Sequence, residues 1–450
     1  MTTTRRVRLR RPDGSVTERL EVSARATAGR HTLAEIRAWI VERGARHNQT
    51  VRRVPFAELD RWSFAPDTGD LRHDTGGFFQ VQGIRVVSDF GPVRQWQQPI
   101  INQPEVGVLG ILAREFDGIL HFLMQAKCEP GNIGGVQISP TVQATRSNYL
   151  RVHAGTAVAH LRHFHDLEPR RVIADVLQSE HGAWFYRKRN RNMIVETTED
   201  LDPGAGFRWM TLGQLHRLMS VDNLVNMDTR TVLSCLPPAG SPDGPALHPG
   251  TELLSWFASR QAQHILDSRL IPLAGVSGWT RATDEIRRDD GGFFKVVGVS
   301  VRAGGREVSD WCQPLIEPVG TEVVGLLTRR IDGVRHSLVH ARVEAGFRGT
   351  VELGGTVQCD PAQHRPPFLD EVLGAPGERI LFDTELSEEG GRFYHAGTRY
   401  RIVEVPEDFP DGDRPDYRWV TDDQLSGLLR HGNYVNVQAR TLVAALRGLR

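Results

Sequence analysis

The stretch GGFF at residues 76–79 recurs as GGFF at residues 291–294, and this recurrence decides the fold. The same shift of 215 residues holds from residue 71 to residue 143, and shifts of 217 upstream and of 208 and 210 downstream extend the match. So many rare residues matching in order do not arise from low complexity. The sequence therefore predicts a duplicated domain of about 200 residues, far longer than a solenoid repeat.

A run rich in proline and glycine, PPAGSPDGPALHPG at residues 237–250, separates the two copies. It cannot continue a helix or a strand ladder, because proline lacks the backbone donor and glycine lacks conformational restraint. We therefore place the first repeat, with an N-terminal extension, at residues 1–237, the linker at 238–249 and the second repeat at 250–450.

Each copy opens with a helical pattern, over residues 32–46 and 251–266, in which apolar residues are spaced three and four apart. Strand-like runs follow, and the Asp-Gly pairs at 117–118 and 332–333 predict hairpins in which the glycine has a positive φ. A later helix in each copy begins at a threonine N-cap. Strands followed by helices without regular alternation predict the α+β class.

The composition excludes several classes of protein. The chain has 55 basic and 55 acidic residues, so it lacks the overall positive charge of a non-specific nucleic-acid binder. No run approaches the ~18 apolar residues of a membrane span, and no apolar segment follows the basic N-terminus as in a secretory signal. The four cysteines lie far apart without a CxxC pair. We therefore expect a cytoplasmic protein with reduced thiols.

The common signatures of cofactor and metal sites are absent from the sequence. No GxGxxG follows a strand, and the P-loop, GxSxG and HExxH motifs do not occur. The histidines at 160, 163 and 165 are flanked by arginines and do not share one helical face, so they predict a solvated surface rather than a metal site. The RExxEE carboxylate cluster of nucleotide-diphosphate hydrolases is also missing. We expect neither a metal nor a cofactor.

A polar set recurs in both copies. The strand period of two places Gln125, Lys127 and Glu129 on one face, and Arg342 and Glu344 occupy the equivalent face of the second copy. A cation beside a carboxylate is a structural ion pair or an anion clamp next to a base, and both interpretations stay open.

Two tryptophans and a polar loop complete the candidate residues. Trp62 and Trp279 occupy equivalent positions, where they either belong to the core or stack on a flat ring. After the shared Thr-Val-Gln, the first copy continues with Thr145 and Arg-Ser-Asn-Tyr at 146–149, which suit a nucleotide diphosphate and a sugar. The second copy is broken by prolines over 359–367. The first copy therefore carries the features expected of an active pocket.

With these motifs the sequence resembles the NDP-hexose 2,3-dehydratase family of deoxysugar biosynthesis. The resemblance covers nearly the whole chain, through the GGFF, WxQP, QAKxExG, TVQATRSNY, SExGxxFY and NxVN elements. It implies two tandem Nudix-like domains without the Nudix metal carboxylates, and a homodimer that acts on dTDP-4-keto-6-deoxy-D-glucose with a nucleotide-sugar pocket in each repeat. This chain has His364-Arg365 where the family pattern usually carries Asn-Tyr in the second copy.

The chemistry of such a substrate follows from its ketone. A C4 ketone acidifies the C3 proton, a base removes that proton, and the C2 hydroxyl then leaves with the help of a proton donor. Tautomerisation gives a 3,4-diketone. No hydride moves, so no nicotinamide is needed, and hydrogen-bond donors can hold the C4 oxyanion. The product is unstable, which implies a partner NAD(P)H-dependent 3-ketoreductase that consumes it.

Within that chemistry we predict Tyr149 and Glu129 as the catalytic residues. The predicted substrate-binding residues are Trp62, Lys127, Gln143, Thr145, Arg146, Ser147, Asn148, Tyr149 and Arg191 in the first pocket and Trp279, Arg342, Gln358 and Arg399 in the second. Two other functions stay open at this point: a divergent Nudix-type pyrophosphohydrolase that cleaves a nucleotide sugar, and a non-catalytic nucleotide-sugar-binding protein.

Overall fold

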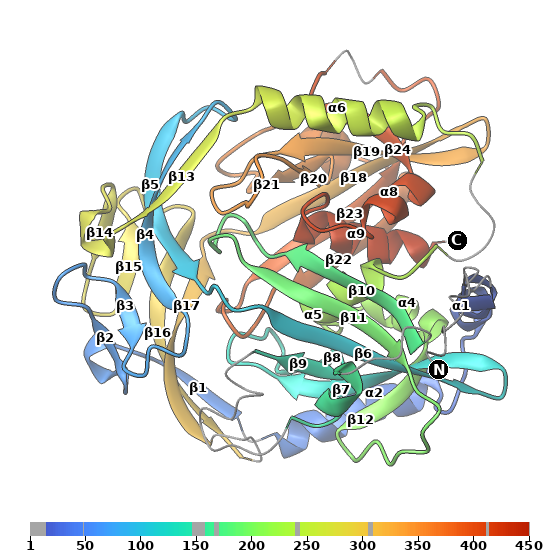
Figure 1. The fold of residues 1–450 in the computed structure, drawn as a ribbon, viewed down its shortest axis with the longest axis horizontal. Helices are drawn as coiled ribbons and strands as arrows, with labels where there is room; N and C mark the ends of the chain where they lie inside the picture. Colours follow the sequence, from blue (N-terminus) through green and yellow to red (C-terminus); the bar gives the residue numbers. More distant parts are fainter. Residues whose placement is uncertain are drawn as a thin grey trace, which may run out of the picture.

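The computed structural model describes residues 15–47, 49–145, 158–165, 171–238, 244–304, 309–410 and 414–449. The first repeat contains α1 (Ser15–Arg25), α2 (Leu33–Arg46), β1 (Gln49–Val54), η1 (Phe56–Glu58), β2 (Trp62–Phe64), β3 (Leu71–His73), β4 (Gln80–Ser88), β5 (Gln95–Asn102), β6 (Gly107–Phe116), β7 (Ile119–Cys128), β8 (Val136–Ser139), β9 (Val142–Ala144), η2 (Leu161–Phe164), β10 (Val172–Ser179), β11 (Arg189–Glu196), β12 (Phe207–Thr211), α4 (Leu212–Met219) and α5 (Met227–Ser234). The second repeat contains α6 (Gly250–Gln263), β13 (Leu266–Ile271), η4 (Leu273–Gly275), β14 (Trp279–Arg281), β15 (Glu285–Arg288), β16 (Phe294–Ala303), β17 (Asp310–Pro318), β18 (Glu322–Ile331), β19 (Val334–Arg342), β20 (Glu352–Gly354), β21 (Val357–Cys359), α7 (Leu369–Leu373), η5 (Gly377–Arg379), β22 (Ile380–Ser387), β23 (Gly397–Glu404), β24 (Tyr417–Thr421), α8 (Asp422–Leu428) and α9 (Val437–Arg447). Sheets flanked by helices confirm the predicted α+β class (Figure 1).

Corresponding strands of the two repeats begin and end at corresponding residues or within one residue of them. β6 and β18 are separated by the predicted shift of 215 residues, and β11 and β23 by the predicted 208. The hairpin between β6 and β7 has the expected positive φ, 77° at Gly118, as has its counterpart at Gly333, with 80°. The predicted duplication is therefore confirmed.

One helix is shorter than predicted. α6 ends at Gln263 rather than at residue 266, because the chain turns to extended backbone at His264 and enters β13. The His264 ring is held from both sides, with Nδ1 3.3 Å from Asp89 and Nε2 2.9 Å from Asp416. These tertiary contacts override the helical pattern of the last residues.

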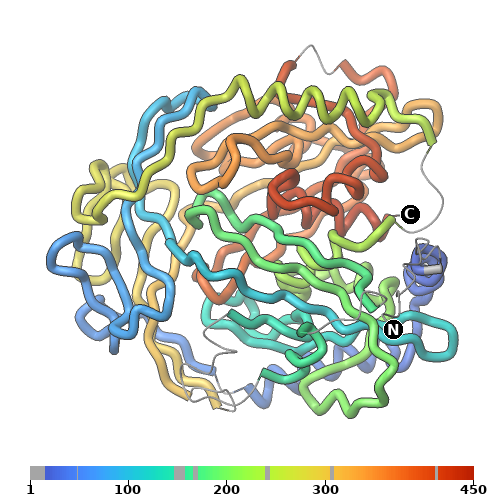
Figure 2. Tube along the Cα trace, in the orientation of Figure 1, coloured from blue at the N-terminus to red at the C-terminus, as the bar shows by residue number. Residues whose placement is uncertain are grey.

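The two repeats exchange a strand. In one five-stranded sheet β13 of the second repeat pairs antiparallel with β4 of the first, and in the other β1 of the first repeat pairs with β16 of the second. Figure 2 shows both exchanges, with the yellow-green β13 along the light-blue β4 and the blue β1 along the tan β16. Each five-stranded sheet therefore needs residues from both repeats, although each seven-stranded sheet is built within one repeat. The linker at 238–249 stays a prediction, and residues 239–243 of it lie outside the described residues.

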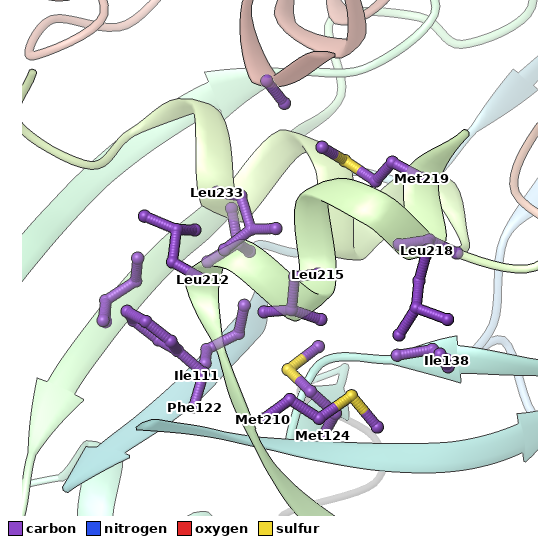
Figure 3. Close-up of a cluster of buried hydrophobic side chains, with 14 of the residues drawn as sticks. Ile111, Phe122, Met124, Ile138, Met210, Leu212, Leu215, Leu218, Met219 and Leu233 are labelled. Carbon is purple, nitrogen blue, oxygen red and sulfur yellow. The ribbon is translucent and has the colours of Figure 1, made fainter. Parts of the chain in front are cut away.

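The core of the first repeat lies between its seven-stranded sheet and helices α1, α2, α4 and α5. α4 presents Leu212, Leu215 and Leu218 to Phe122 and Met124 of β7 (Figure 3). The helix begins at the predicted threonine N-cap, and the structure adds a complete capping box. Burying each such side chain contributes about 1.5–3 kcal/mol.

Two fully buried arginines join the repeats where α5 meets α9. Arg230 donates from Nη2 to the Ser387 carbonyl at 2.9 Å, and Arg440 donates from Nη2 to the Ser179 carbonyl at 2.5 Å. Each guanidinium also donates from Nε to a threonine on the opposite helix, at 3.1 Å and 2.6 Å. The symmetric pair therefore fixes the start of the two segments 179–186 and 387–394, which match each other between the repeats and matter for the site.

The described residues contain no helix with an apolar stretch long enough to cross a bilayer. All four cysteines are free thiols: Cys128, Cys235 and Cys359 are buried and Cys312 is half-buried. The stability of this chain therefore comes from packing and hydrogen bonds rather than from disulfides.

Candidate active site

A row of hydrogen-bonded polar side chains crosses the sheet of the first repeat. At the end of β7, Lys127 Nζ lies 3.0 Å from Glu129 Oε1 and donates to Gln143 Oε1 on β9, also at 3.0 Å. Gln143 in turn donates from Nε2 to Asp228 Oδ2 in the first turn of α5. Three predicted site residues are thus brought together, and Asp228 is a fourth member that the sequence analysis did not single out.

Asp228 lies in an unusually acidic, buried environment. Burial raises its pKa well above the usual value, and the negative charges of Glu389, Glu180 and Glu129 raise it further, while Lys127 opposes them. The protonated form of Asp228 is therefore favoured. Strong perturbation by burial and charged partners is typical of functional sites.

A second layer of charged groups surrounds this row. Glu180 is buried and accepts a hydrogen bond from Asn190 Nδ2 at 2.8 Å. Lys188 is buried as well, and its Nζ donates to the Glu105 carbonyl at 2.5 Å. Burial lowers the pKa of Lys188. The site therefore combines several carboxyl groups with cations in a poorly solvated interior.

The second repeat contributes directly to this site. The Gly131 amide, just after β7, donates to the Gly390 carbonyl at 2.7 Å, and the His395 amide donates to the Gly131 carbonyl at 2.9 Å. A Cβ at Gly131 would lie 1.6 Å from the Phe393 carbonyl oxygen, so only glycine permits this approach. The segment 387–394 therefore reaches the end of β7 and brings Glu389 to the first-repeat site.

The second repeat has a related polar row. Arg342 Nε lies 3.6 Å from Glu344 Oε1, and Gln358 Nε2 donates to the same oxygen at 3.1 Å. Asn436, the N-cap of α9, donates to Gln358 Oε1 at 3.0 Å. The ion pair that the sequence left open is thus present in both repeats, as Lys127–Glu129 and as Arg342–Glu344.

A cavity of about 480 Å³ opens beside this second row. Its lining consists of Phe90, Gly91, Pro92, His340, Arg342, Gln358, His364, Pro366, Pro367, Arg414, Pro415, Asp416 and Tyr417. The rings of His340 and Tyr417 stack at 4.2 Å with an angle of 7°. Two of the four residues predicted for the second pocket, Arg342 and Gln358, therefore lie at a cavity large enough for a small ligand.

The matching pocket of the first repeat is described only in part. Gln125, Lys127 and Gln143 correspond to lining residues of the second cavity, and Thr145 follows β9. The predicted residues Arg146, Ser147, Asn148 and Tyr149 lie outside the described residues. Their roles stay predictions.

The two tryptophans form contacts between the repeats. Trp62 is 7% exposed and donates from Nε1 to the Cys312 carbonyl at 2.8 Å. Trp279 is half-buried and donates from Nε1 to the Gln97 carbonyl at 2.9 Å. Both indoles pack with the apolar cluster that the repeats share, which is the core interpretation left open by the sequence.

The two predicted substrate-binding arginines on β11 and β23 form ion pairs with the neighbouring strand. Arg191 Nη2 lies 2.6 Å from Asp175 Oδ2, and Arg399 Nη2 lies 2.7 Å from Asp383 Oδ2. Neither Trp279 nor Arg399 lines the second cavity. A phosphate would have to compete with these carboxylates for the guanidinium groups.

The described parts of the chain contain no group of three or more His, Cys, Asp or Glu side chains able to hold a metal ion. Two of the three candidate histidines stack on each other, with His160 and His163 ring centroids 6.2 Å apart. His160 also lies 3.4 Å from the Pro203 carbonyl through Nε2. These contacts are local packing contacts.

Comparison with known proteins identifies the family of the chain. A family model described as NDP-hexose 2,3-dehydratase matches residues 33–236 and 250–446. The chain belongs to this family. A relative from Amycolatopsis orientalis, named dTDP-4-dehydro-6-deoxy-alpha-D-glucopyranose 2,3-dehydratase, is 51% identical over 444 residues, which covers 95% of this chain and 93% of the relative. Relatives with the same name from Saccharopolyspora spinosa and Streptomyces violaceoruber are 46% and 48% identical, over 97% and 94% of this chain and 96% and 97% of their own lengths.

A solved structure also matches at a much lower level. It is a crystal structure of an ADP compounds hydrolase, 19% identical, with a TM-score of 0.19, and the match covers 28% of this chain and 69% of that one. A similarity this weak gives no information about the fold or the activity of this chain.

Two residues of the site escaped the sequence analysis. Asp228 ends the first NLVNMD element, where the second copy has NYVNVQ and Gln438, and Glu389 lies in SEEG, where the first copy has SEHG and His181. Both elements were interpreted as caps, turns or family markers. Residues that match between the copies can be explained by the shared fold. The sequence feature that could have identified Asp228 and Glu389 is therefore a carboxylate in one copy where the other copy has an uncharged residue or a histidine.

A buried carboxyl group of the second repeat gives a pH-dependent prediction. Burial raises the pKa of Glu352 from 4.5 to about 7, so the folded chain binds more protons than the unfolded chain between these values and stability falls as pH rises through this window. The Glu352→Gln variant removes this effect. Gln is already the residue at the equivalent position, Gln137, which donates from Nε2 to Ser387 Oγ, whereas Glu352 Oε2 accepts from Ser179 Oγ.

We therefore expect Glu352→Gln to match the parent in free energy of unfolding below pH 4.5 and to exceed it by on the order of 3 kcal/mol above pH 7. Urea unfolding between pH 4 and pH 8 measures the difference. A difference that does not change over this range would show that Glu352 titrates normally.

Proposed function

We propose that the chain is a dTDP-4-dehydro-6-deoxyglucose 2,3-dehydratase, a carbon–oxygen lyase of deoxysugar biosynthesis. The observation that carries the proposal is identity of 46–51% over 94–97% of this chain to three proteins of that name. The first-repeat row of Lys127, Glu129, Gln143 and Asp228 supplies a cation, carboxyl groups and amide donors at one place, as the reaction requires.

The proposed reaction removes water across C2 and C3. A carboxylate takes the C3 proton, and the C4 carbonyl accepts the electron pair as an enolate. The enolate expels the C2 hydroxyl, which leaves as water once it is protonated. The enol that remains tautomerises to the 3,4-diketo-2,6-dideoxy sugar. The reaction needs neither oxidant nor hydride.

For the chemical step we propose Glu129 as the base and Tyr149 as the donor that holds the C4 oxyanion. Lys127 lies 3.0 Å from Glu129 and stabilises its negative charge. Only 13% of the Glu129 side chain is exposed. A poorly solvated carboxylate that is not fully buried is suited to receive a proton from a bound sugar.

For binding we propose a nucleotide-sugar pocket in each repeat. In the first pocket Lys127, Gln143 and residues 145–148 meet the nucleotide sugar, and Trp62 and Arg191 are the weaker assignments because they pack in the shared core and pair with Asp175, respectively. In the second pocket Arg342 and Gln358 line the cavity, and Trp279 and Arg399 are the weaker assignments because they do not line it. Charge-assisted contacts of this kind contribute roughly 1.5–3 kcal/mol each.

We further propose that each repeat is Nudix-like, that the protein is a homodimer in the cytoplasm, and that an NAD(P)H-dependent 3-ketoreductase consumes the diketone. The mixed sheet, in which β6 and β11 run parallel beside antiparallel strands, supports the fold assignment. Four free cysteines support a reducing compartment. Reactivity of the diketone supports the partner enzyme.

The test is incubation of the protein with dTDP-4-dehydro-6-deoxyglucose, followed by mass spectrometry of the nucleotide sugar. We expect loss of one water with the dTDP group intact. Release of a nucleoside monophosphate would indicate a pyrophosphohydrolase instead, and an unchanged sugar would indicate binding without catalysis. Added ketoreductase and NADPH trap the diketone and prevent its decay from hiding the product.

A further inference from the structure

Glu389 lies deep in the protein and still contacts solvent. It is half-buried, and its side chain makes neither a hydrogen bond nor an ion pair to any residue that the structure describes. The glycine two positions later leaves a small space beside it. A Cβ at Gly391 would lie 3.2 Å from Glu389 Oε1 and 3.5 Å from Glu129 Oε2, so the carboxyl groups of Glu389 and Glu129 flank the same space.

The environments of these two carboxyl groups differ in a useful way. Glu129 is paired with Lys127 at 3.0 Å, which stabilises its charge. Glu389 has no such partner: burial raises its pKa to about 7, and Glu180 and Glu129 add to the effect, although Arg392 opposes it. Glu129 therefore has a cation beside it that favours the carboxylate form, whereas the raised pKa of Glu389 favours a carboxyl group that still carries its proton near neutral pH. Such a division is typical of a base and an acid that act together.

The second repeat lacks this arrangement. The residue equivalent to Glu389 is His181, which the first repeat supplies to the second-repeat site. Its Nε2 lies 3.2 Å from Glu388 Oε2, and its Nδ1 lies 3.0 Å from Gln438 Nε2. His181 is 1% exposed, so it is closed off from any ligand. An accessible carboxyl group at this position is a property of the first-repeat site alone among the described residues.

We infer that Glu389, which the second repeat supplies to the first-repeat site, is the general acid that protonates the departing C2 hydroxyl. The inference rests on the proposed function. The Glu129 carboxylate takes the C3 proton, the C2–O bond breaks, and the leaving oxygen takes the proton of Glu389 to form water. Proton transfer from Glu129 to Glu389 across the space beside Gly391 then restores both groups.

This assignment gives the second repeat a role in the first site. The segment 387–394 is held there by the Gly131–Gly390 hydrogen bond and by Arg230, which donates to the Ser387 carbonyl. Glu389 is therefore positioned by contacts that only the paired repeats can form. Neither repeat by itself contains both members of the acid–base pair.

The test separates C3 deprotonation from water loss. The full-length Glu389→Gln variant, incubated with the ketosugar in D₂O, is expected to exchange the C3 proton for deuterium, because Glu129 is intact. Its rate of water loss is expected to fall by about 10²–10⁴-fold. Affinity for dTDP, measured by calorimetry, is expected to stay within about threefold of the parent. Glu389→Asp keeps the acid and is expected to recover part of the lost rate.

Two comparison variants complete the experiment. Glu129→Gln is expected to lose C3 exchange and water loss together. Glu352→Gln removes another buried carboxyl group with a raised pKa, on β20 of the second repeat, and is expected to keep both activities. Parent-like water loss in Glu389→Gln, or simultaneous loss of C3 exchange and dTDP binding, would overturn the assignment. A parent protein that loses no water overturns the proposed function instead.

Discussion

Residues 250–450 expressed without the first repeat are expected to lack a cooperative unfolding transition, and so are residues 1–238 expressed alone. The second repeat alone would lack β1, the partner of its β16, and the first repeat alone would lack β13, the partner of its β4. Each would also expose its side of the apolar cluster that includes Trp62, Phe294 and Phe393. Unpaired strand edges next to exposed apolar surface favour aggregation over folding. Circular dichroism during heating, with size-exclusion chromatography, measures this outcome.

The matched control is the same chain cut within residues 239–243 with both pieces produced together. Because the exchanged strands and the buried arginines are present in that complex, we expect it to unfold cooperatively, at a lower temperature than the intact chain. The difference arises because association of two chains costs entropy that a single chain does not lose. A single half that is monomeric and unfolds cooperatively would contradict the idea that the exchanged strands are required.

Duplication was predictable because it depends only on matching residues at fixed shifts. The strand exchange was not, because β1 (QTVRRV) and β13 (LDSRLI) lack the alternation of apolar and polar residues that marks a strand, and even a recognised strand does not identify its partner. β1 follows α2, β13 follows the equivalent helix α6, and each strand pairs with the opposite repeat through six residues. Long-range pairing of this kind leaves no local trace in the sequence.

The candidate site was predictable in part for the same reason. Lys127, Glu129 and Gln143 lie within 17 residues of one another, so strand periodicity and the Thr-Val-Gln motif brought them together. Asp228 and Glu389 reach the same place from α5 and from the second repeat. A sequence analysis could have ranked them higher by asking where one copy has a carboxylate and the other has not.

Arg440→Ala is expected to cost on the order of 3–5 kcal/mol in the free energy of unfolding. The guanidinium is fully buried and donates to the Ser179 carbonyl, the Val435 carbonyl and Thr231 Oγ1, at 2.5, 2.7 and 2.6 Å. Truncation removes this donor from all three acceptors, and each buried group left unsatisfied costs about 1–3 kcal/mol. Burial lowers the pKa of Arg440, so some of this loss is offset by no longer burying a cation.

An exposed ion pair provides the control for that loss. Arg46 on α2 has 65% of its side chain exposed and pairs with Glu42 one turn earlier, so Arg46→Ala is expected to cost less than about 0.5 kcal/mol. Urea unfolding at pH 7 compares the two variants. Because Arg440 holds Ser179 and its counterpart Arg230 holds Ser387, Arg230→Ala should cost a similar amount. Equal, small losses for Arg440→Ala and Arg46→Ala would mean that the interface between α5 and α9 rests on apolar packing alone.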